Sequence, residues 1–244
     1  MKGIILAGGT GSRLLPLTKM MNKHLIPIGK FPMIYYGIER LREAGITDLF
    51  IVIGSKSVPL YADFIGSGQS LGVHVSFLIQ EEAGGIAQAL SLVEPFLAPS
   101  ERFVVLLGDN LFHDSLKPYL QQYENQGNGE ARVLLKKVKD AHRYGVPVLD
   151  EQEPERIIKI EEKPRKPKSN FCVTGIYMYD TAVFEHIRHI SPSARGELEI
   201  TDVNNAYASK GLLQYNILNG WWTDAGTYES LHAARIKLGR RGKR

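Results

Sequence analysis

The sequence predicts an α/β protein: a Rossmann-like, three-layer fold with a mainly parallel sheet and helices on both faces. Two observations lead to this fold class. Apolar, strand-like runs alternate with helix-like segments through the first half of the chain, and such alternation is typical of parallel sheets covered by helices. A glycine-rich loop also follows the first apolar run directly. Loops at the carboxyl ends of parallel strands are where such folds bind ligands.

Hydrophobic periodicity and length place the individual elements. In the first half we expect strands at 2–7, 48–53, 73–79 and 102–107, and helices at 33–44, 57–66, 85–93 and 115–125. The rhythm changes after about residue 130, with strands expected at 131–138, 144–149, 156–161 and 172–179 and helices at 180–190, 198–208 and 227–238. We therefore expect a single domain over residues 1–244, in which the second half completes a second lobe on the same sheet.

Composition and charge are those of an ordinary globular protein. The 244 residues are 43% hydrophobic and 23% charged, which provides ample core. The net charge of +4 comes from a basic tail at residues 240–244. Because the remainder is formally neutral and lacks a clustered basic face, we expect no nucleic-acid binding.

Cysteine content and hydropathy bear on the compartment. Cys172 is the only cysteine, so no disulfide can form within the chain, and we expect a cytoplasmic protein with Cys172 as a small buried hydrophobe. No apolar stretch approaches the about 18 residues that a membrane-spanning helix needs. We therefore expect no association with a membrane.

The glycine-rich loop is the strongest functional feature of the sequence. Glycines at three of four positions allow a sharp turn and a close approach of the backbone to a ligand. The loop can thus present several peptide N–H groups to one phosphate, and Arg13 adds a fork of donors for its oxygens. The alternative is an ordinary glycine turn with a surface arginine. The loop is made of Leu6, Ala7, Gly8, Gly9, Thr10, Gly11, Ser12 and Arg13.

Two aspartates are candidates for a metal site. Asp109 follows the apolar run 103–107 after one glycine and precedes Asn110, and Asp224 ends a short apolar run before a helix. A carboxylate at the carboxyl end of a strand can point into the ligand crevice and hold Mg²⁺. Asp109 could instead stabilise a turn, and Asp224 could be a helix N-cap.

The glycine loop resembles the signature G-G-x-G-x-R-L of sugar nucleotidyltransferases, and residues 23–27 (Lys-His-Leu-Ile-Pro) resemble the second signature, K-x-L-[LIV]-P. Matching motifs continue to about residue 237. The spans around Asp109 and Asp224 are similar to the two metal-binding segments, L-G-D-N and W-x-D-x-G-T, of glucose-1-phosphate thymidylyltransferases. Further similar segments are those ending at Ala89 and those at 143–146, 161–164, 173–177 and 192–202.

The resemblance, to a short form of this family, implies an activity and an architecture. The family transfers a deoxythymidylyl group from dTTP to α-D-glucose 1-phosphate, with release of pyrophosphate, on a GT-A-like fold. By that match residues up to about 130 would bind the nucleotide and residues 131–239 the sugar. Mg²⁺ bound by Asp109 and Asp224 is the implied cofactor. Relatives commonly form tetramers or dimers, so the resemblance also implies a homo-oligomer.

The resemblance also implies roles at the nucleotide. Arg13 and the loop would hold the triphosphate, and Lys23 would contact the phosphates being rearranged. Gln80 would read the base, because an amide both donates and accepts, as the N3–H and O4 edge of thymine or uracil requires. Gly85 would let the base lie close to the backbone. Gln80 could otherwise be a solvated residue at a strand end.

The sugar-phosphate site is implied by the later motifs. Glu162 would accept hydrogen bonds from sugar hydroxyls, while Lys163 and Arg195 would hold the phosphate. Three further residues are expected to line this site: Asn110, Gly145 and Val173. The alternatives are a solvated charge cluster at 161–163 and an arginine that is only a surface charge.

Two other functions stay open at the level of sequence. A uridylyl- or cytidylyltransferase would use the same fold, and one methyl group separates thymine from uracil, which is worth only about 1–3 kcal/mol of discrimination. A sugar-nucleotide sensor without catalysis is the alternative from another class. A sensor has no need for both candidate metal carboxylates, which favours the enzyme.

Overall fold

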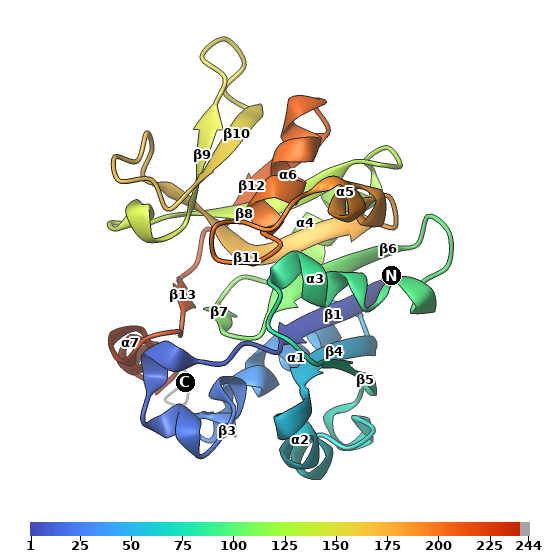
Figure 1. Cartoon of the computed structure of the whole chain (residues 1–244), viewed down its shortest axis with the longest axis vertical. Helices are drawn as coiled ribbons and strands as arrows, with labels where there is room; N and C mark the ends of the chain where they lie inside the picture. The colour runs from blue at the N-terminus through green and yellow to red at the C-terminus, as the bar shows by residue number, and fades with distance from the viewer. Residues whose placement is uncertain (240–244) are drawn as a thin grey trace. The chain divides into compact units, whose positions relative to one another are not determined.

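The computed structural model describes residues 1–239, so the basic tail expected at 240–244 lies outside the described residues (Figure 1). Seven strands form the central sheet in the order β12, β8, β11, β6, β1, β4, β5. Parallel pairing joins β1 (Lys2–Ala7) to β4 (Asp48–Gly54), β4 to β5 (His74–Gln80), and β12 (Leu213–Ile217) to β8 (Ala131–Lys137). Strand β11 (Phe171–Asp180) runs antiparallel to β8. The predicted α/β class with a mainly parallel sheet is confirmed.

The chain forms two compact units, each assembled from segments that are distant in the sequence. The unit that contains β1, here the β1 unit, consists of Lys2–Ala83, Leu106–Leu116 and the described residues after Asn219. The β8 unit consists of Met1, Gly84–Val105 and Lys117–Asn219. Strand β6 (Arg102–Leu107) contributes residues to both units. The expected single domain with a functional boundary near residue 130 stays a prediction.

Continuous apolar runs build the core of the β1 unit. Ile4 and Ile5 of β1 and the run 51–53 of β4 are completely buried, as expected for parallel strands covered on both faces. Helix α1 (Met33–Glu43) contacts β1 and places Met33, Ile34, Ile38 and Leu41 on its buried side. Helix α2 (Val58–Phe64) follows β4.

Short elements complete the β1 unit at the carboxyl end of β1. Strand β2 (Pro27–Ile28) pairs with β3 (Phe31–Pro32), and β7 (Asn110–Phe112) pairs antiparallel with β13 (Trp222–Asp224). Helix α7 (Tyr228–Gly239) contacts β2 and β13, and its Leu231 and Ala234 are buried in one cluster with Leu14. These contacts fix the positions of the segments that carry the candidate site residues of this unit.

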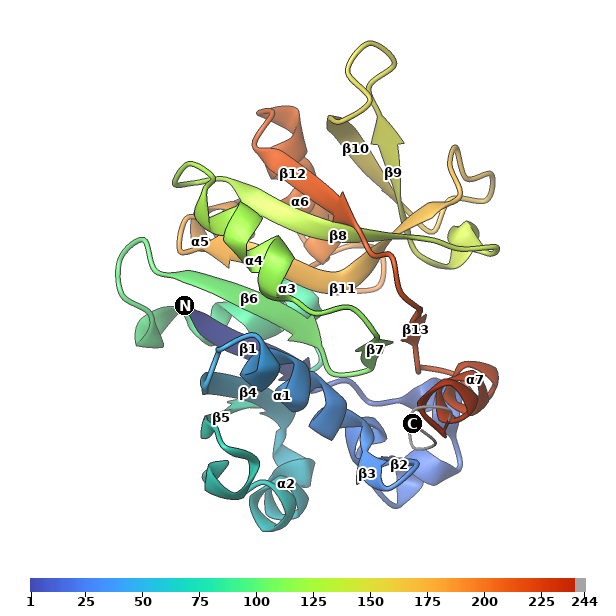
Figure 2. The ribbon, with the colours of Figure 1, turned by 180° about the vertical axis from the view of Figure 1, so that it is seen from behind.

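The β8 unit contains the sheet strands β12, β8 and β11, which lie side by side in Figure 2. An antiparallel hairpin of β9 (Gly145–Leu149) and β10 (Ile157–Glu162) extends the unit, and α6 (Ile200–Ser209) packs on β10. The remaining helices are α3 (Ile86–Ser91), α4 (Lys117–Glu124) and α5 (Val183–His189). The rings of Tyr177, Tyr179 and Tyr207 stack within its core.

All of the helices and strands expected from periodicity are present, with ends shifted by a few residues. Strand β12 was not predicted from the sequence, because only Leu213 of its five residues is buried and no apolar run marks it. The short pairs β2–β3 and β7–β13 were missed as well. Cys172 is a free, buried cysteine, as expected. Among residues 1–239, no helix has the length and apolar character needed to cross a membrane.

Candidate functional site

The glycine loop follows β1 in the β1 unit, and the structure favours glycine at two of its positions. Gly11 has a φ of 66°, a left-handed conformation that favours glycine, and it precedes the 3-10 turn Ser12–Leu14. A Cβ at Gly8 would collide with Oε1 of Gln80. The loop therefore turns sharply, and its backbone passes close to a neighbouring side chain.

Gln80 lies at the end of β5, beside the glycine loop, and is almost completely buried. Its strand position is opposite Gly54, which ends β4. Gly85 belongs to the β8 unit, where it has a φ of 103°. A Cβ at this glycine would lie 2.5 Å from the carbonyl oxygen of Leu198, so packing against that segment requires a glycine here.

Lys23 and Asp109 form a buried ion pair in the β1 unit. Lys23 begins the 3-10 turn Lys23–Leu25, and its Nζ lies 2.6 Å from Oδ2 of Asp109. Asn110 donates from Nδ2 to Oδ1 of Asp109 at 3.0 Å. Burial opposes ionisation of Asp109, but the charge of Lys23, assisted by these hydrogen bonds, holds its pKa well below the usual range. Asp109 is therefore a carboxylate at neutral pH.

Asp224 lies beside this pair. Strand pairing sets Asp224 opposite Asn110, and the amide of Ala225 donates to the carbonyl oxygen of Asp109. Burial and the nearby negative charge of Asp109 raise the pKa of Asp224, whereas Lys23 and Arg13 act in the opposite direction. The two candidate metal carboxylates are therefore close enough to interact electrostatically.

The guanidinium of Arg13 also lies near Asp224, and the absence of a side chain at Gly226 leaves room for it. A Cβ at Gly226 would lie 2.9 Å from Nη2 of Arg13 and 2.6 Å from Oδ1 of Asp224. The amide of Gly226 donates to that same carboxylate oxygen at 2.6 Å. The structure thus brings Arg13, at the end of the glycine loop, close to Lys23, Asp109 and Asp224.

The chemistry of this group fits a magnesium ion. Mg²⁺ prefers oxygen ligands and is commonly bound by one or two carboxylates together with substrate phosphates and water. Two interacting carboxylates, Asp109 and Asp224, meet that requirement. Within residues 1–239 no group of three or more His, Cys, Asp or Glu side chains is placed to hold a metal ion by itself. A cation at this pair would therefore need ligands from a substrate or water.

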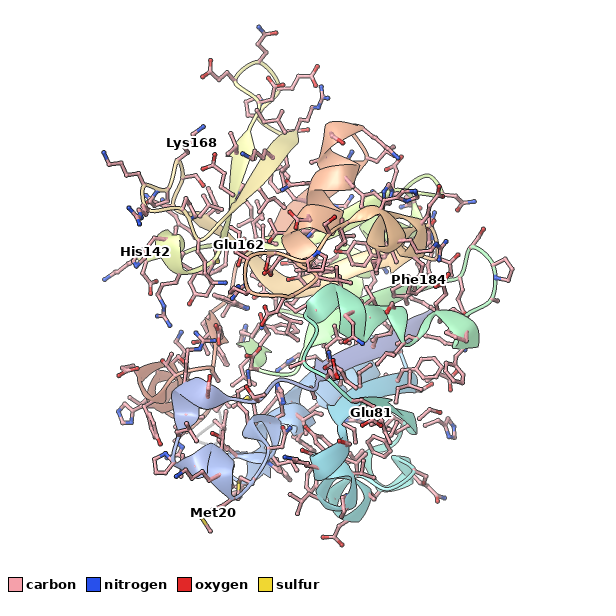
Figure 3. All side chains as sticks on the ribbon, viewed as in Figure 1. Met20, Glu81, His142, Glu162, Lys168 and Phe184 are labelled. Atoms are coloured by element: carbon pink, nitrogen blue, oxygen red, sulfur yellow. The ribbon has the colours of Figure 1, made fainter. Side chains whose placement is uncertain are left out.

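A second group of candidate residues lies in the β8 unit, where Glu162 ends β10 (Figure 3). Its strand partner is Gly145, and Thr201 of α6 donates from Oγ1 to Oε2 of Glu162 at 2.7 Å. Nζ of Lys163 lies 2.5 Å from Oε1. Burial opposes ionisation of Glu162, but the hydrogen bonds from Lys163 and Thr201 and the positive charges of Lys163 and Arg195 lower its pKa.

Arg195 lies near this group but is engaged by other carboxylates. Its Nη2 lies 2.8 Å from Oε1 of Glu199 and 3.5 Å from Oε2 of Glu197. An anion at Arg195 would therefore compete with Glu199. Val173 lies on β11 opposite Leu135, next to an irregularity in the strand pairing. The structure brings Gly145, Glu162 and Lys163 into contact, with the charge of Arg195 acting on Glu162.

Asn110 is positioned in the β1 unit by contacts that could not be predicted from the sequence. Besides its bond to Asp109, it accepts at Oδ1 a hydrogen bond of 2.7 Å from Nε1 of Trp222. Thr201 and Asn22 were missed as well. Thr201 lies within the recognised segment at 192–202, and Asn22 directly precedes Lys23, so proximity to a motif was the available signal.

The chain belongs to the nucleotidyl transferase family, whose profile matches residues 2–241. The glucose-1-phosphate thymidylyltransferase of Neisseria meningitidis serogroup A is 41% identical over 96% of this chain and 81% of its own length. The enzyme of the same name from Xanthomonas campestris (strain B100) is also 41% identical, over 96% of this chain and 79% of its own length.

Solved structures share the fold over nearly the whole chain. A Bacillus anthracis protein, provisionally described as a glucose-1-phosphate thymidylyltransferase and crystallised in complex with sucrose, is 52% identical with a TM-score of 0.91. The match covers 97% of this chain and 94% of that one. A UDP-glucose pyrophosphorylase in complex with UDP-glucose is 26% identical with a TM-score of 0.87, over 98% of both chains.

Proposed function

We propose that this chain transfers a deoxythymidylyl group from dTTP to α-D-glucose 1-phosphate and yields dTDP-glucose and pyrophosphate. The names of relatives about 40% identical over nearly the whole chain support the substrates. The observation that carries the proposal is the meeting of Lys23 and Arg13 with the carboxylates Asp109 and Asp224. Phosphoryl-group chemistry relies on such positioning and charge stabilisation rather than on a protein nucleophile.

The residues of the β1 unit act on the triphosphate. The peptide N–H groups of the glycine loop and the guanidinium of Arg13 bind the phosphates and stabilise the charge that develops on the departing pyrophosphate. Lys23 leaves Asp109 and binds the α-phosphate of dTTP, which is transferred from pyrophosphate to the sugar phosphate. Mg²⁺ on Asp109 and Asp224, when bound, neutralises phosphate charge. Gln80 presents both a donor and an acceptor to the pyrimidine edge.

The residues of the β8 unit hold the sugar phosphate. Glu162, ionised and fixed by Thr201, accepts hydrogen bonds from sugar hydroxyls, next to the main chain of Gly145. Lys163 and Arg195 bind the phosphate and orient one of its oxygens for in-line attack on the α-phosphorus of dTTP. The bond from that phosphorus to the pyrophosphate breaks as the new one forms, so no covalent intermediate with the protein is needed. Such orientation is a large part of the rate acceleration.

Pyrophosphate release from glucose 1-phosphate and Mg²⁺ tests the proposal, with dTTP, UTP, CTP, ATP and GTP in parallel reactions. A strong signal with dTTP and a weaker one with UTP is expected. A stronger signal with UTP would favour the uridylyl activity that the name of the more distant solved relative suggests. Silence with all five would refute the proposal and favour a sugar-nucleotide sensor or another sugar phosphate.

Three further features belong to the same proposal. Mg²⁺ is proposed as the divalent ion, and removal of Mg²⁺ with the chelator EDTA should abolish turnover. A homo-oligomer, dimeric or tetrameric, is proposed by analogy with the family and is tested by light scattering on the purified chain. A cytoplasmic location is proposed because the chain is expected to use intracellular nucleotides.

A further inference from the structure

The side chain of Asn22 is the centre of a hydrogen-bond network in the β1 unit. Its Oδ1 accepts from the backbone N–H of His24 at 2.9 Å, from Nδ1 of His24 at 2.9 Å and from the hydroxyl of Tyr61 at 3.0 Å. Its Nδ2 donates to the carbonyl oxygen of Ala7 at 3.3 Å and to Oγ of Ser57 at 3.2 Å. One amide thus forms five hydrogen bonds to four residues.

The partners of Asn22 connect the two segments that carry the phosphate chemistry. Ala7 is the last residue of β1 and the start of the glycine loop, and His24 lies in the turn that Lys23 begins. Ser57 and Tyr61 supply the fixed end of the network, because Tyr61 is completely buried in α2. The network therefore ties both segments to α2 and to the residue that precedes it.

The ring of His24 extends this connection to Asp109. Because Oδ1 of an amide carries no hydrogen, Nδ1 of His24 must be the donor, which fixes the tautomer of a neutral ring. A Cβ at Gly108 would lie 2.7 Å from Cδ2 of His24, so the ring packs directly on the backbone that precedes Asp109. Asn22 thus holds the turn that contains Lys23 against Gly108, which precedes Asp109, the ion-pair partner of Lys23.

An N-cap role alone does not account for this arrangement. Asn22 is the N-cap of the turn Lys23–Leu25, and capping uses only the hydrogen bond from the amide of His24. The bonds to Ala7, Ser57, Tyr61 and the His24 ring lie outside the turn's own backbone. Three of the five hydrogen bonds, those to Ala7, Ser57 and Tyr61, therefore place the turn relative to its surroundings, and the bond to the His24 ring orients that ring.

We propose that Asn22 is a positioning residue that holds Lys23 in place for catalysis by anchoring its turn to the start of the glycine loop and to α2. This inference rests on the proposed nucleotidyl transfer, in which Lys23 contacts the phosphates. Misplacement of a reacting or charge-stabilising group by about 1 Å can cost 100-fold in rate. Loss of the network should therefore appear in kcat far more than in the KM for glucose 1-phosphate.

The test is a double-mutant cycle of Asn22→Ala and Lys23→Ala, read by pyrophosphate release. Asn22→Ala should lower kcat at least about 10-fold, and the double variant should match Lys23→Ala within about 3-fold, because Asn22 acts through Lys23. Asn22→Ser keeps a capping oxygen, so it protects folding, and it should still lower kcat about 5-fold or more. The inference is overturned if kcat is unchanged in Asn22→Ala or if the two losses multiply.

Asn216→Ala is the matched control. Asn216 lies in β12, outside both candidate sites, and its amide is engaged by Arg132 and Gln122. This variant should lower the melting temperature but leave kcat unchanged. A fall in kcat that simply follows melting temperature in both asparagine variants would overturn the inference.

A crystal structure of Asn22→Ala separates this inference from the proposed function. Positioning requires that Nζ of Lys23 move beyond 4 Å from Oδ2 of Asp109, whereas an unchanged distance would contradict it. If the wild-type chain releases no pyrophosphate with any nucleotide, the proposed function fails. The crystallographic distance still decides whether Asn22 positions Lys23.

Discussion

Nζ of Lys23 lies 2.6 Å from Oδ2 of Asp109, so a protonated amine occupies the carboxylate that the proposed metal would share. Both side chains are only 12% exposed. At this depth a carboxylate without a cation is costly, and Asp224 adds a second one nearby. Lys23 therefore supplies the positive charge that the pair needs when no metal is bound.

Lys23→Met should destabilise the metal-free protein. Breaking a largely buried ion pair leaves Asp109 without its counter-charge, and the expected loss in the free energy of unfolding is about 3 kcal/mol. Added Mg²⁺ should raise the melting temperature of this variant more than that of the wild type, because the metal no longer has to displace an ammonium group. Thermal unfolding with and without Mg²⁺ measures both effects. Equal Mg²⁺ responses would contradict the exchange of Lys23 for metal.

Arg13→Ala should lower kcat by at least about 100-fold, the usual loss when a donor that stabilises developing charge is removed. The guanidinium lies beside Gly226 and Asp224, where the triphosphate is proposed to bind. Steady-state kinetics with dTTP as the varied substrate provide the measurement. Arg13→Lys keeps the charge but not the fork of donors and should recover only part of the activity. A change confined to KM would assign Arg13 to binding alone.

Long segments with a clear period could be predicted from the sequence. Strands such as β1 and β4 are continuous apolar runs because both of their faces are buried, and α1 carries an apolar face at helical spacing. Strand β12 could not be found this way, because its residues are mostly half-buried and its place in the sheet depends on β8, about 80 residues earlier in the chain.

The candidate site was foreseen in its residues but less well in its contacts. Asp109 and Asp224 are far apart in the sequence, and the β7–β13 pairing together with the hydrogen bond from Ala225 to Asp109 brings them together. The engagement of Arg195 by Glu199 and the network around Asn22 depend on side-chain packing that no motif spacing encodes. A motif identifies residues that suit a given chemistry. Which side chains form hydrogen bonds and ion pairs with one another depends on how the whole chain folds.

His24 should make the folded chain less stable as the pH decreases below about 6.5. Burial, together with the charge of Lys23, lowers the pKa of His24 from 6.5 to about 3. The unfolded chain therefore binds a proton below pH 6.5 that the folded chain does not. As the pH decreases from 6.5 to about 3, protonation of His24 in the unfolded chain should reduce the free energy of unfolding by up to about 1.4 kcal/mol per pH unit.

His24→Gln isolates this contribution, because glutamine stays neutral throughout the range. Urea unfolding of both proteins between pH 7.5 and 5 gives the difference in the free energy of unfolding at each pH. That difference should move in favour of His24→Gln as the pH falls below about 6.5. A difference that stays constant over the whole range would show that His24 is not held neutral by the fold.

Glu162→Gln should weaken binding of the sugar phosphate. The variant preserves the size of the side chain but replaces charged hydrogen bonds, worth about 1.5–3 kcal/mol each, by neutral ones. KM for glucose 1-phosphate should rise about 10-fold, while KM for dTTP stays unchanged. Thr201→Val removes only the donor to Oε2 of Glu162 and should cause a smaller rise in the same constant. A rise in KM for dTTP instead would move Glu162 to the nucleotide.

Asp224→Asn should separate metal binding from folding. Burial and the charge of Asp109 both disfavour a second carboxylate at this position, so an amide should leave the stability of the metal-free protein unchanged or raise it. Oδ1 of asparagine can still accept the hydrogen bond from Gly226.

The Mg²⁺ concentration for half-maximal turnover should rise at least about 10-fold in Asp224→Asn, since one of two carboxylate ligands is lost. The control is Asp150→Asn, whose carboxylate accepts hydrogen bonds from Gln152 and Glu153 in a loop of the β8 unit and should not affect the Mg²⁺ titration. If both variants titrate with Mg²⁺ like the wild type, Asp224 is not a metal ligand, and its burial beside Asp109 serves only to hold Gly226 and Arg13 in place.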